Sequence, residues 1–491
     1  MSTPLHSKKL VIVGCGASAV LALAALANYS RDHVASVASA HSSDALHLDI
    51  TIIDDSPTRP RGLAYSAIHP SLILNVPAQR MGAFSDDPAH FFRWLQQTVE
   101  WRGLHPAFAG LSVAANNFVP RAIYGAYLAD VFDQAVYSLR IAGHSVGLHS
   151  GRVSAIENNS SSGVMRVITC SGRTYDTNAL LMATGNHPAL QNIPTTPNIL
   201  PSPYVNEALG FNWKNSKNIL VLGSGLSLVD VVQLAISQGF AGKFHVVSAH
   251  GLLPCAHGES HHPSVPVFKT EAKKGSAILG AIRQYIKRNE EKGIAWQCSV
   301  NQLREQNNAL WSQLNPKERS RLKRALPWWN SVRHRIPAST RNLLEHLQTK
   351  EQLCIYPARV NNIHATHNGF SLSLASARSK NARLEIIADK AIICTGYRAG
   401  FSVVQDLCKG LLDDSAVLTA NFIGNNHYRI SSRHEIYGIG PALTSVLFET
   451  TAIQEIREQA VCIAKAIFTT TADKANTNTN STQAVGIVCT E

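Results

Sequence analysis

The first pattern along the chain is a change of hydrophobic periodicity between residues 8 and 30. Residues 10–13, Leu-Val-Ile-Val, form a continuous apolar run of the kind found in strands that are buried on both faces. Residues 17–27 are rich in alanine and leucine, which favour helices. Gly14 and Gly16 separate the two runs, so the segment predicts a strand, a glycine turn and a helix. It does not predict a membrane span, which needs about 20 uninterrupted apolar residues.

The glycine turn fits the dinucleotide-binding pattern G-x-G-x-x-A. Gly14 allows a tight turn, Gly16 removes a side chain where a pyrophosphate approaches the backbone, and Ala19 permits close packing of helix on strand. A second apolar strand ends at Asp54, whose carboxylate suits ribose hydroxyls; a turn or N-cap aspartate is the alternative. The spacing is about twice the usual ~20 residues. We assign the excess to the polar stretch 30–44, interpreted as an inserted loop.

The same design recurs about 200 residues later. Residues 217–222 form an apolar strand that leads into Gly223 and Gly225, a helix follows through Ser237, and residues 243–248 predict the next strand. Two such units indicate two dinucleotides and hence an enzyme that passes hydride from one to the other. The alternative is a duplication in which one of the sites is inactive.

Two short apolar strands end in the same dipeptide. Thr184-Gly185 closes the first and Thr395-Gly396 closes the second, and the pair flanks the second glycine turn. In flavoproteins that bind two dinucleotides, such strands mark where the chain leaves the FAD domain and where it returns.

Composition and charge narrow the class of protein. The 491 residues predict two or three domains, and the nine scattered cysteines, without a C-x-x-C pair, argue against a disulfide framework and a dithiol redox centre. No metal site is expected, because the histidines lack metal-ligand spacing. MSTPLHSKK leads directly into the first strand without a secretory signal, so we expect a cytoplasmic protein.

The net charge of +12 is compatible with nucleic acid, a membrane surface or anionic small molecules as partners. Residues 316–337 concentrate basic side chains beside Trp328 and Trp329. This segment can be a solvated helix with an aromatic turn, an anion-binding segment or, least favoured, a nucleic-acid site. We expect a small-molecule partner, with no nucleic acid and no membrane.

Six segments resemble the bacterial FAD/NAD(P)-binding oxidoreductases that are related to flavin-dependent N-hydroxylating monooxygenases. They are RGLAYS (61–66), LNVPAQRMGAFSDDPAHFFRWL (74–95), FVPRAIYGAYL (118–128), ILVLGSGLSLVDV (219–231), WWNSVRHRIP (328–337) and IYGIGPALTSVLFETTAIQEIREQA (436–460). The resemblance covers about residues 8–465 in the same order. Some members of the family oxidise the amine of aspartate, and many have no assigned substrate.

The resemblance implies an α/β fold with two Rossmann-like dinucleotide-binding domains and a helical insert in the second. We expect an FAD-binding domain split between residues 1–190 and 360–468. The NAD(P)-binding domain is expected at 212–359, with its insert at about 255–345. Residues 469–491, rich in threonine and asparagine, predict a disordered tail.

The glycine turns and the resemblance together define the expected site residues. The cofactor-binding residues expected for FAD and for NADPH or NADH are Gly14, Gly16, Ser18, Ala19, Asp54, Gly62, Thr184, Gly185, Gly223, Gly225, Ser227, His250, Thr395, Gly396, Gly440, Thr450 and Thr451. Thr450 and Thr451 are expected in the first turn of a helix, residues 449–459, that points at the flavin.

Three residues in the segment that resembles the flavin-adjacent turn, Asn75, Gln79 and Arg80, are the catalytic candidates; an ordinary loop is the alternative. Arg333 and Arg335 are expected to contact an anionic substrate or the cofactor. Relatives often carry arginines where this chain has Ala249 and His250, and a neutral histidine holds a 2′-phosphate less well than a guanidinium. The sequence therefore leaves NADPH and NADH open.

The expected activity is that of an FAD-dependent monooxygenase reduced by NAD(P)H, which hydroxylates an amine or other nucleophilic small molecule through a flavin C4a-hydroperoxide. Such chemistry needs positioning and desolvation around the flavin rather than a catalytic triad. Two alternatives stay open: a flavin reductase or dehydrogenase without oxygen transfer, and a non-catalytic redox-sensing protein that binds nucleotides.

Overall fold

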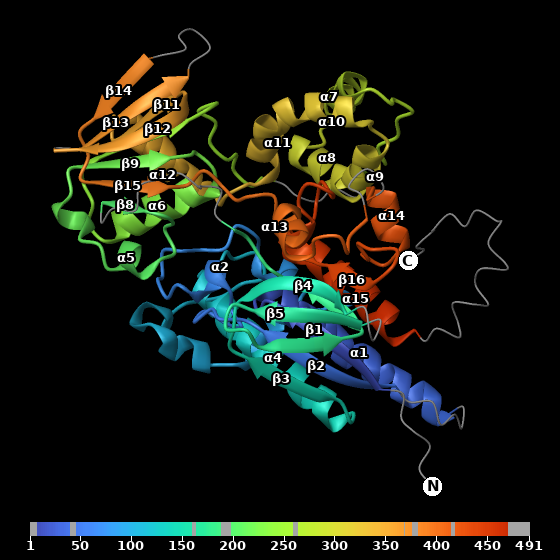
Figure 1. The fold of residues 1–491 in the computed structure, drawn as a ribbon. Helices are drawn as coiled ribbons and strands as arrows, with labels where there is room; N and C mark the ends of the chain where they lie inside the picture. Colours follow the sequence, from blue (N-terminus) through green and yellow to red (C-terminus); the bar gives the residue numbers. More distant parts are fainter. Residues whose placement is uncertain are drawn as a thin grey trace.

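The computed structural model describes residues 7–39, 46–159, 164–187, 198–258, 264–367, 369–375, 382–413 and 418–469. Its main chain forms two parallel five-stranded sheets and a separate group of helices (Figure 1). The expected tail lies outside these residues, apart from Thr469. No helix in the described part of the chain is both long and apolar enough to cross a membrane.

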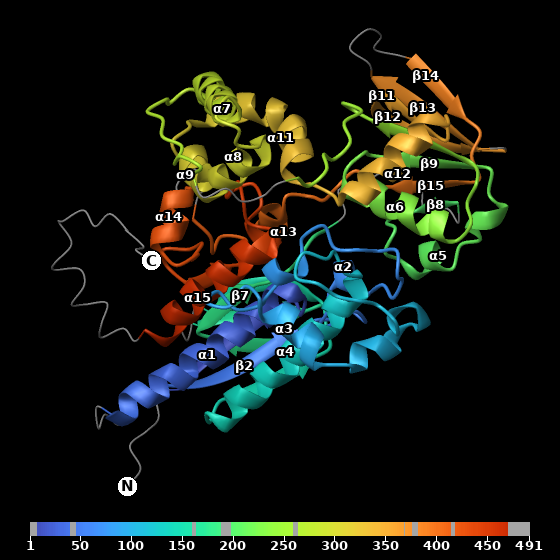
Figure 2. The same ribbon diagram turned by 180° about the vertical axis from the view of Figure 1, so that it is seen from behind.

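The first sheet has the strand order β16-β7-β1-β2-β3. Its strands are β1 (Ser7–Val13), β2 (His47–Ile53), β3 (Ser145–His149), β7 (Ala179–Met182) and β16 (Glu435–Gly438). Helices α1 (Ala17–Ser39), α4 (Arg121–Ile141) and α15 (Ile453–Phe468) cover one face (Figure 2). The antiparallel strands β4 (Val153–Asn159), β5 (Val164–Thr169) and β6 (Thr174–Thr177) pack on the other.

Alternate residues of β1 face these two layers. Leu10 and Ile12 pack in the core with α1, α4 and α15, whereas Val11 and Val13 pack with residues of β4 and β5. All four side chains are buried, with exposed fractions of 6% or less. The uninterrupted apolar run is therefore explained by a strand with two covered faces.

The second sheet has the order β11-β10-β9-β15-β8. Its strands are β8 (Ile199–Leu200), β9 (Asn218–Leu222), β10 (Lys243–Ser248), β11 (Leu353–Pro357) and β15 (Lys390–Ile393). Helices α6 (Leu226–Ser237) and α12 (Ala338–Thr349) share one core with this sheet. The antiparallel strands β12 (Arg359–Thr366), β13 (Gly369–Ala375) and β14 (Ala382–Ile386) cover its other face.

The return of the chain to the first sheet lies later than the sequence predicts. Strand β15 pairs with β9 and β8 in the second sheet, and the next strand of the first sheet is β16. We therefore propose that the second domain extends over about residues 198–396 rather than 212–359. The apolar Ala-Ile-Ile run of β15 fits an interior strand of either parallel sheet. The sequence pattern therefore does not indicate to which sheet β15 belongs.

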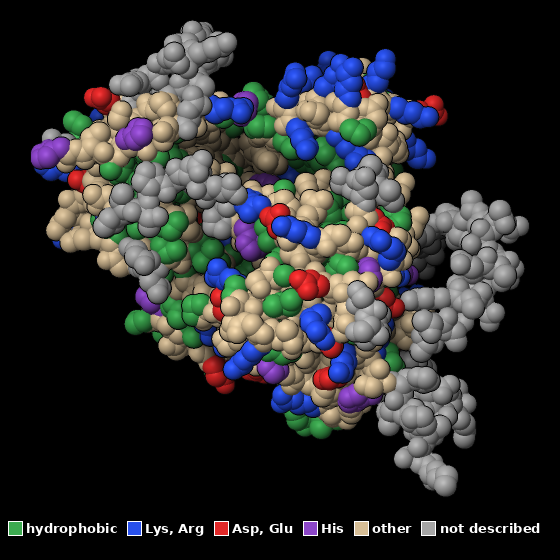
Figure 3. Space-filling model, viewed as in Figure 1, with side chains coloured by type: hydrophobic (Ala, Val, Ile, Leu, Met, Phe, Trp, Pro, Cys, Tyr) green, Lys and Arg blue, Asp and Glu red, His purple; other side chains and the backbone are tan. Residues whose placement is uncertain are grey.

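The helical insert consists of α7 (Gly275–Glu290), α8 (Trp296–Leu303), α9 (Asn307–Ser312), α10 (Pro316–Leu322) and α11 (Leu326–Arg333). It lies next to α13 (Gly400–Leu407) and α14 (Ala420–Asn425), away from the β12–β14 layer (Figure 1). Exposed lysines and arginines gather over it, and the surface is hollowed between the insert and the second sheet (Figure 3).

Two helices differ in length from the sequence expectation. Helix α1 continues to Ser39, so residues 30–39 of the predicted loop are helical; no proline or glycine interrupts them, and residues 40–44 lie outside the described residues. Helix α15 begins at Ile453 and not at residue 449, which leaves Thr450 in the preceding turn. The remaining short helices are α2 (Leu63–Ser66), α3 (His90–Gln97) and α5 (Asn206–Leu209).

A buried ion pair joins the two sheet units. Arg121, the first residue of α4, donates to Asp230 of α6 at 3.2 Å, and the hydroxyl of Tyr204 donates to the same carboxylate oxygen at 2.5 Å. The exposed fractions are 9% for Arg121, 2% for Asp230 and 7% for Tyr204. This contact fixes the helix after the second glycine turn against the first sheet unit.

Candidate functional site

The first glycine turn joins β1 to α1 beside the end of β7. Gly14 has a φ of +98°, and a Cβ there would overlap the carbonyl oxygen of Ala183. Gly16 faces Gly62, whose Cα would lie 3.6 Å from a Cβ added at Gly16. Glycine is thus required at position 14 for the fold itself, whereas Gly16 opens the backbone of the turn toward the adjoining cavity.

A cavity of about 590 Å³ lies over this turn. Eight of the expected cofactor-binding residues line it, namely Gly14, Gly16, Ser18, Asp54, Gly62, Thr184, Gly185 and Thr451. Ala19 lies behind the turn with no exposed surface, as its packing role requires. The hydroxyl oxygen of Thr184 is buried and has no hydrogen-bond partner in the described structure.

The carboxylate of Asp54 lies at the mouth of the turn. It accepts hydrogen bonds from the backbone N–H groups of Cys15 and Ser56. Burial, followed by the charge of Asp54, raises the pKa of the Cys15 thiol to about 12. The glycine cradle, the carboxylate and the unpaired Thr184 hydroxyl fit a dinucleotide such as FAD.

Gly440 and Thr450 support the cavity from behind. The Thr450 hydroxyl donates to the Gly440 carbonyl at 2.9 Å, and Gln459 bonds both residues through its side-chain amide, at 2.9 and 2.8 Å. Thr450 and Gln459 are at most 2% exposed. This network fixes the N-terminus of α15 next to Thr451, so the positive end of the helix dipole lies beside the cavity.

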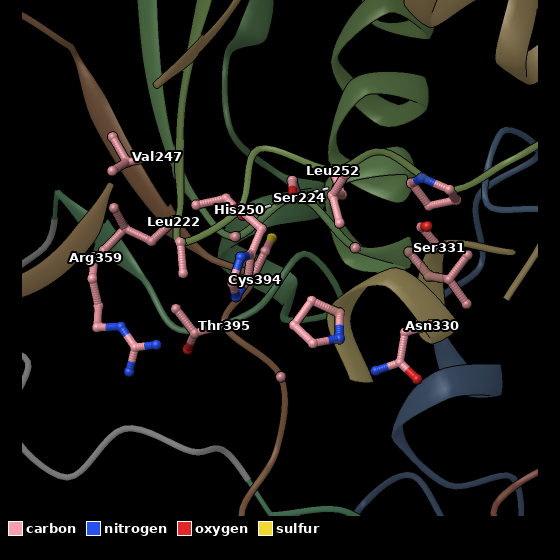
Figure 4. Close-up of a pocket in the computed structure, with 18 of the residues that line it drawn as sticks. Leu222, Ser224, Val247, His250, Leu252, Asn330, Ser331, Arg359, Cys394 and Thr395 are labelled. Carbon is pink, nitrogen blue, oxygen red and sulfur yellow. Dashed lines mark hydrogen bonds between the residues drawn. The ribbon is translucent and has the colours of Figure 1, made fainter. Parts of the chain in front are cut away.

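The second glycine turn joins β9 to α6 and adjoins a cavity of about 470 Å³ (Figure 4). Gly223 has a φ of +107°, and a Cβ there would overlap the carbonyl oxygen of Cys394. The expected residues that line this cavity are Gly223, Gly225, His250, Thr395 and Gly396. Thr395 and Gly396 therefore lie at the second turn and not at the FAD domain, where the strand pattern predicted them.

The sequence analysis did not predict all the residues that line this cavity, and Ser224 and Arg359 are two examples. Ser224 lines it instead of Ser227, and its hydroxyl donates to the Leu252 carbonyl at 2.6 Å. Arg359, at the start of β12, also lines it (Figure 4). Arg359 lies 111 residues beyond the end of β10 in the sequence, so local spacing gives no signal for it.

The catalytic and substrate candidates lie in another region, where the helical insert meets the first sheet unit. Arg80 ends a short 3₁₀ helix, Ala78–Arg80. The carbonyl of Asn75 accepts from His257 at 2.8 Å, and the Gln79 amide donates to Asn116 at 2.5 Å. None of the three candidates is among the described residues that line the two cavities at the glycine turns.

Five arginines, which we call the arginine cluster, influence one another here: Arg80, Arg304, Arg333, Arg335 and Arg457. Burial, followed by the charges of Arg304, Arg333 and Arg457, lowers the pKa of Arg80. Carboxylates compensate the cluster in part: Arg304 forms two bonds with Glu455, at 2.5 and 2.7 Å, and Arg333 donates to Glu449 at 3.1 Å.

Arg335 is the least satisfied member of the arginine cluster. It is 4% exposed, donates through Nη2 to Asn301, and stacks at 5.7 Å on Trp296. Its Nε and Nη1 atoms are buried without a partner in the described structure. Burial, followed by repulsion from Arg333 and Arg80, lowers its pKa to about 10. A buried cation with free donors is costly unless an anion meets it.

The basic segment 316–337 divides into two parts. Its first part is exposed, at Lys317, Arg321, Lys323 and Arg324, whereas Arg333 and Arg335 point inward to the arginine cluster.

No group of three His, Cys, Asp or Glu side chains suited to a metal ion occurs among the residues that the structure describes.

Comparisons with known proteins identify the first part of the chain. Residues 11–187 match the family model of FAD-NAD(P)-binding domains. No curated protein sequence matches the chain significantly.

Solved structures match the whole architecture. The reduced form of ornithine hydroxylase from Pseudomonas aeruginosa has a TM-score of 0.60 at 16% identity, and L-lysine 6-monooxygenase from Pseudomonas syringae has 0.59 at 17%. The ornithine N-hydroxylase of Kutzneria sp. 744, with reduced FAD, NADP⁺ and L-ornithine, has 0.58 at 15%. In each case the match covers 94% of this chain and 99% of the other.

A disulfide reductase shares the architecture as well. The bacillithiol disulfide reductase of Staphylococcus aureus has a TM-score of 0.51 at 11% identity, covering 94% of this chain and 98% of the other. These identities establish the fold and leave the reaction open. Residues 11–187 thus match an FAD-NAD(P)-binding family model, and the chain as a whole has the two-domain fold that the N-hydroxylating monooxygenases also have.

Proposed function

We propose that this protein is an FAD-dependent, NAD(P)H-driven monooxygenase that hydroxylates the amine, or another nucleophilic atom, of a small anionic molecule. The observation that carries the proposal is Arg335, which is 4% exposed and has two buried nitrogens without a partner in the described structure. A carboxylate of a small substrate that reached these nitrogens would satisfy them by charge-assisted hydrogen bonds.

FAD, when bound, would supply the redox chemistry that links oxidation of the nicotinamide coenzyme to reduction of dioxygen. The chain supplies position and charge. The first glycine turn and Asp54 hold FAD, the second turn holds the nicotinamide coenzyme, and the arginine cluster orients the substrate. One substrate, one dioxygen, one NAD(P)H and one proton give one hydroxylated product, one NAD(P)⁺ and one water. The first oxygen atom enters the product, and the hydride and the proton convert the second oxygen atom to water.

Cysteine chemistry gives little support to a disulfide reductase. Cys15 lies in the first glycine turn but is 1% exposed, and burial followed by Asp54 raises its pKa to about 12. Burial also raises the pKa of Cys394, beside the second turn. Thiolates, the reactive species, are therefore strongly disfavoured at both positions. A reductase that simply passes electrons onward is the competing function.

A stopped-flow experiment separates the two functions. The protein is reduced with NAD(P)H without oxygen and is then mixed with oxygenated buffer. We expect a transient species whose absorbance differs from both reduced and oxidised flavin, followed by return of the oxidised spectrum. Direct one-step reoxidation, with all the oxygen released as hydrogen peroxide whichever anionic amine is added, would contradict oxygen transfer.

Arg335→Ala tests the anion site. Loss of charge-assisted hydrogen bonds, worth about 1.5–3 kcal/mol, predicts a kcat/KM for an anionic substrate about 10- to 100-fold lower. Flavin reduction by the coenzyme without substrate should not change. Arg166→Ala, an exposed arginine on β5, is the control for an equal loss of charge.

A further inference from the structure

The two glycine turns of this chain differ in the residues that come after the neighbouring strand. Strand β2 ends at a carboxylate, Asp54, which lies at the first turn. Strand β10 ends at Ser248, and Ala249 and His250 come next. None of the described residues that line the second cavity is Asp or Glu. A carboxylate at this place bonds a free ribose 2′-hydroxyl and repels a 2′-phosphate, so its absence matters for coenzyme choice.

In the second unit, an arginine that follows the adjoining strand β11 lines the cavity. Strand β11 pairs with β10, with Pro357 opposite Ser248, and the N–H of Ala358 donates to the Ser248 carbonyl at 2.9 Å. These contacts fix Arg359 next to the end of β10. Its side chain and the ring of His250 both line the cavity (Figure 4).

From this arrangement we propose that Arg359, assisted by His250, binds the 2′-phosphate of NADPH and makes the second site selective for NADPH over NADH. Arg359 is exposed and forms no ion pair with a described carboxylate, so its donors are available to a ligand. The planar guanidinium fork matches two phosphate oxygens. His250 is half-buried, and its ring packs against Trp328 at 4.8 Å, which restricts its orientation.

Other nearby cations are less suited to this role. Lys243 begins β10, five residues before Ser248, so it lies about 17 Å from that end of the strand. Arg398 follows Gly396 but donates to Asp406 at 3.2 Å and to Ser402 at 3.4 Å. Arg359, in contrast, lines the cavity, because the pairing of β11 with β10 brings it next to the end of β10. No described Asp or Glu lines the cavity there, so a phosphate would not be repelled.

The inference rests on the second turn being the nicotinamide site, and it is independent of oxygen transfer. It is tested by titrating the FAD-loaded protein calorimetrically with NADP⁺, NAD⁺ and 2′,5′-ADP. We expect NADP⁺ to bind about 10- to 100-fold more tightly than NAD⁺. Arg359→Ala should remove most of that difference by weakening NADP⁺ and 2′,5′-ADP, with NAD⁺ unchanged. Arg359→Lys should retain part of it, and His250→Ala should have a smaller effect.

Lys243→Ala is the matched control, because it removes one positive charge from the same sheet at the opposite end of β10. It should leave all three affinities unchanged. An equal loss for NADP⁺ and NAD⁺ in Arg359→Ala, no loss at all, or a loss in Lys243→Ala as large as in Arg359→Ala would overturn the proposal. The flavin spectrum of each variant shows that the fold and FAD binding persist. Selective NADP⁺ binding without oxygen transfer would refute only the monooxygenase function.

Discussion

Replacement of Asp230 by asparagine should destabilise the protein strongly. The substitution retains the shape of the side chain but removes the charge that compensates Arg121, which is 9% exposed. Both partners lie between the two sheet units, and Tyr204 also bonds the carboxylate. Removal of one member of a buried ion pair costs about 3–5 kcal/mol, because the other charge is left uncompensated.

The assay is urea unfolding at saturating FAD, with tryptophan fluorescence as the signal, compared between wild type and variant. Asp406→Asn is the control, since it removes the same kind of charge from an exposed pair with Arg398, in which Asp406 is 65% exposed. Its expected cost is about 1 kcal/mol or less. Equal losses in the two variants would refute the reasoning, because burial could then not be the source of the effect.

Three further predictions concern the glycine turns and acid stability. Gly16→Val should give a folded but colourless protein, because its side chain occupies the pyrophosphate's place, and FAD content measures this. Gly225→Val should retain FAD but abolish reduction by NAD(P)H, since a Cβ there meets no atom within 4 Å and the added methyls enter the cavity. Burial of the ring, followed by the charge of His47, lowers the pKa of His144 to about 4. As the pH falls, His144 takes up a proton near its usual pKa of about 6.5 in the unfolded state, but only near pH 4 in the folded state. About 3 kcal/mol of stability should therefore be lost as the pH falls from about 6.5 to 4. His144→Gln should flatten this part of the stability curve, and an unchanged curve would contradict the explanation.

The strands and glycine turns could be predicted because their signals are local. The apolar runs at β1 and β9 report burial on both faces, and the glycines that follow report a tight turn. The helices next to the turns were also predicted, although α1 is longer than expected. The polar and β-branched residues after Ser30 are weak helix formers and led to the prediction of a loop, but no proline or glycine ends the helix before Ser39.

The parts of the site that could not be predicted depend on contacts between distant residues. Arg359 reaches the second cavity through the pairing of β11 with β10, and no sequence pattern encodes that register. Thr395-Gly396 was assigned to the wrong sheet, because a short apolar strand fits either. The inward direction of Arg335 follows from its packing on Trp296 and Asn301, which only the fold brings together.

The most direct test of the central claim is the fate of labelled dioxygen. The FAD-loaded protein is incubated with NADPH, isotopically labelled dioxygen and small anionic amines, and the products are analysed by mass spectrometry together with NADPH consumption. The monooxygenase account predicts one labelled oxygen atom in the product for each NADPH consumed, and loss of this coupling in Arg335→Ala. NADPH oxidation that yields only labelled hydrogen peroxide, with every amine unchanged, would contradict it.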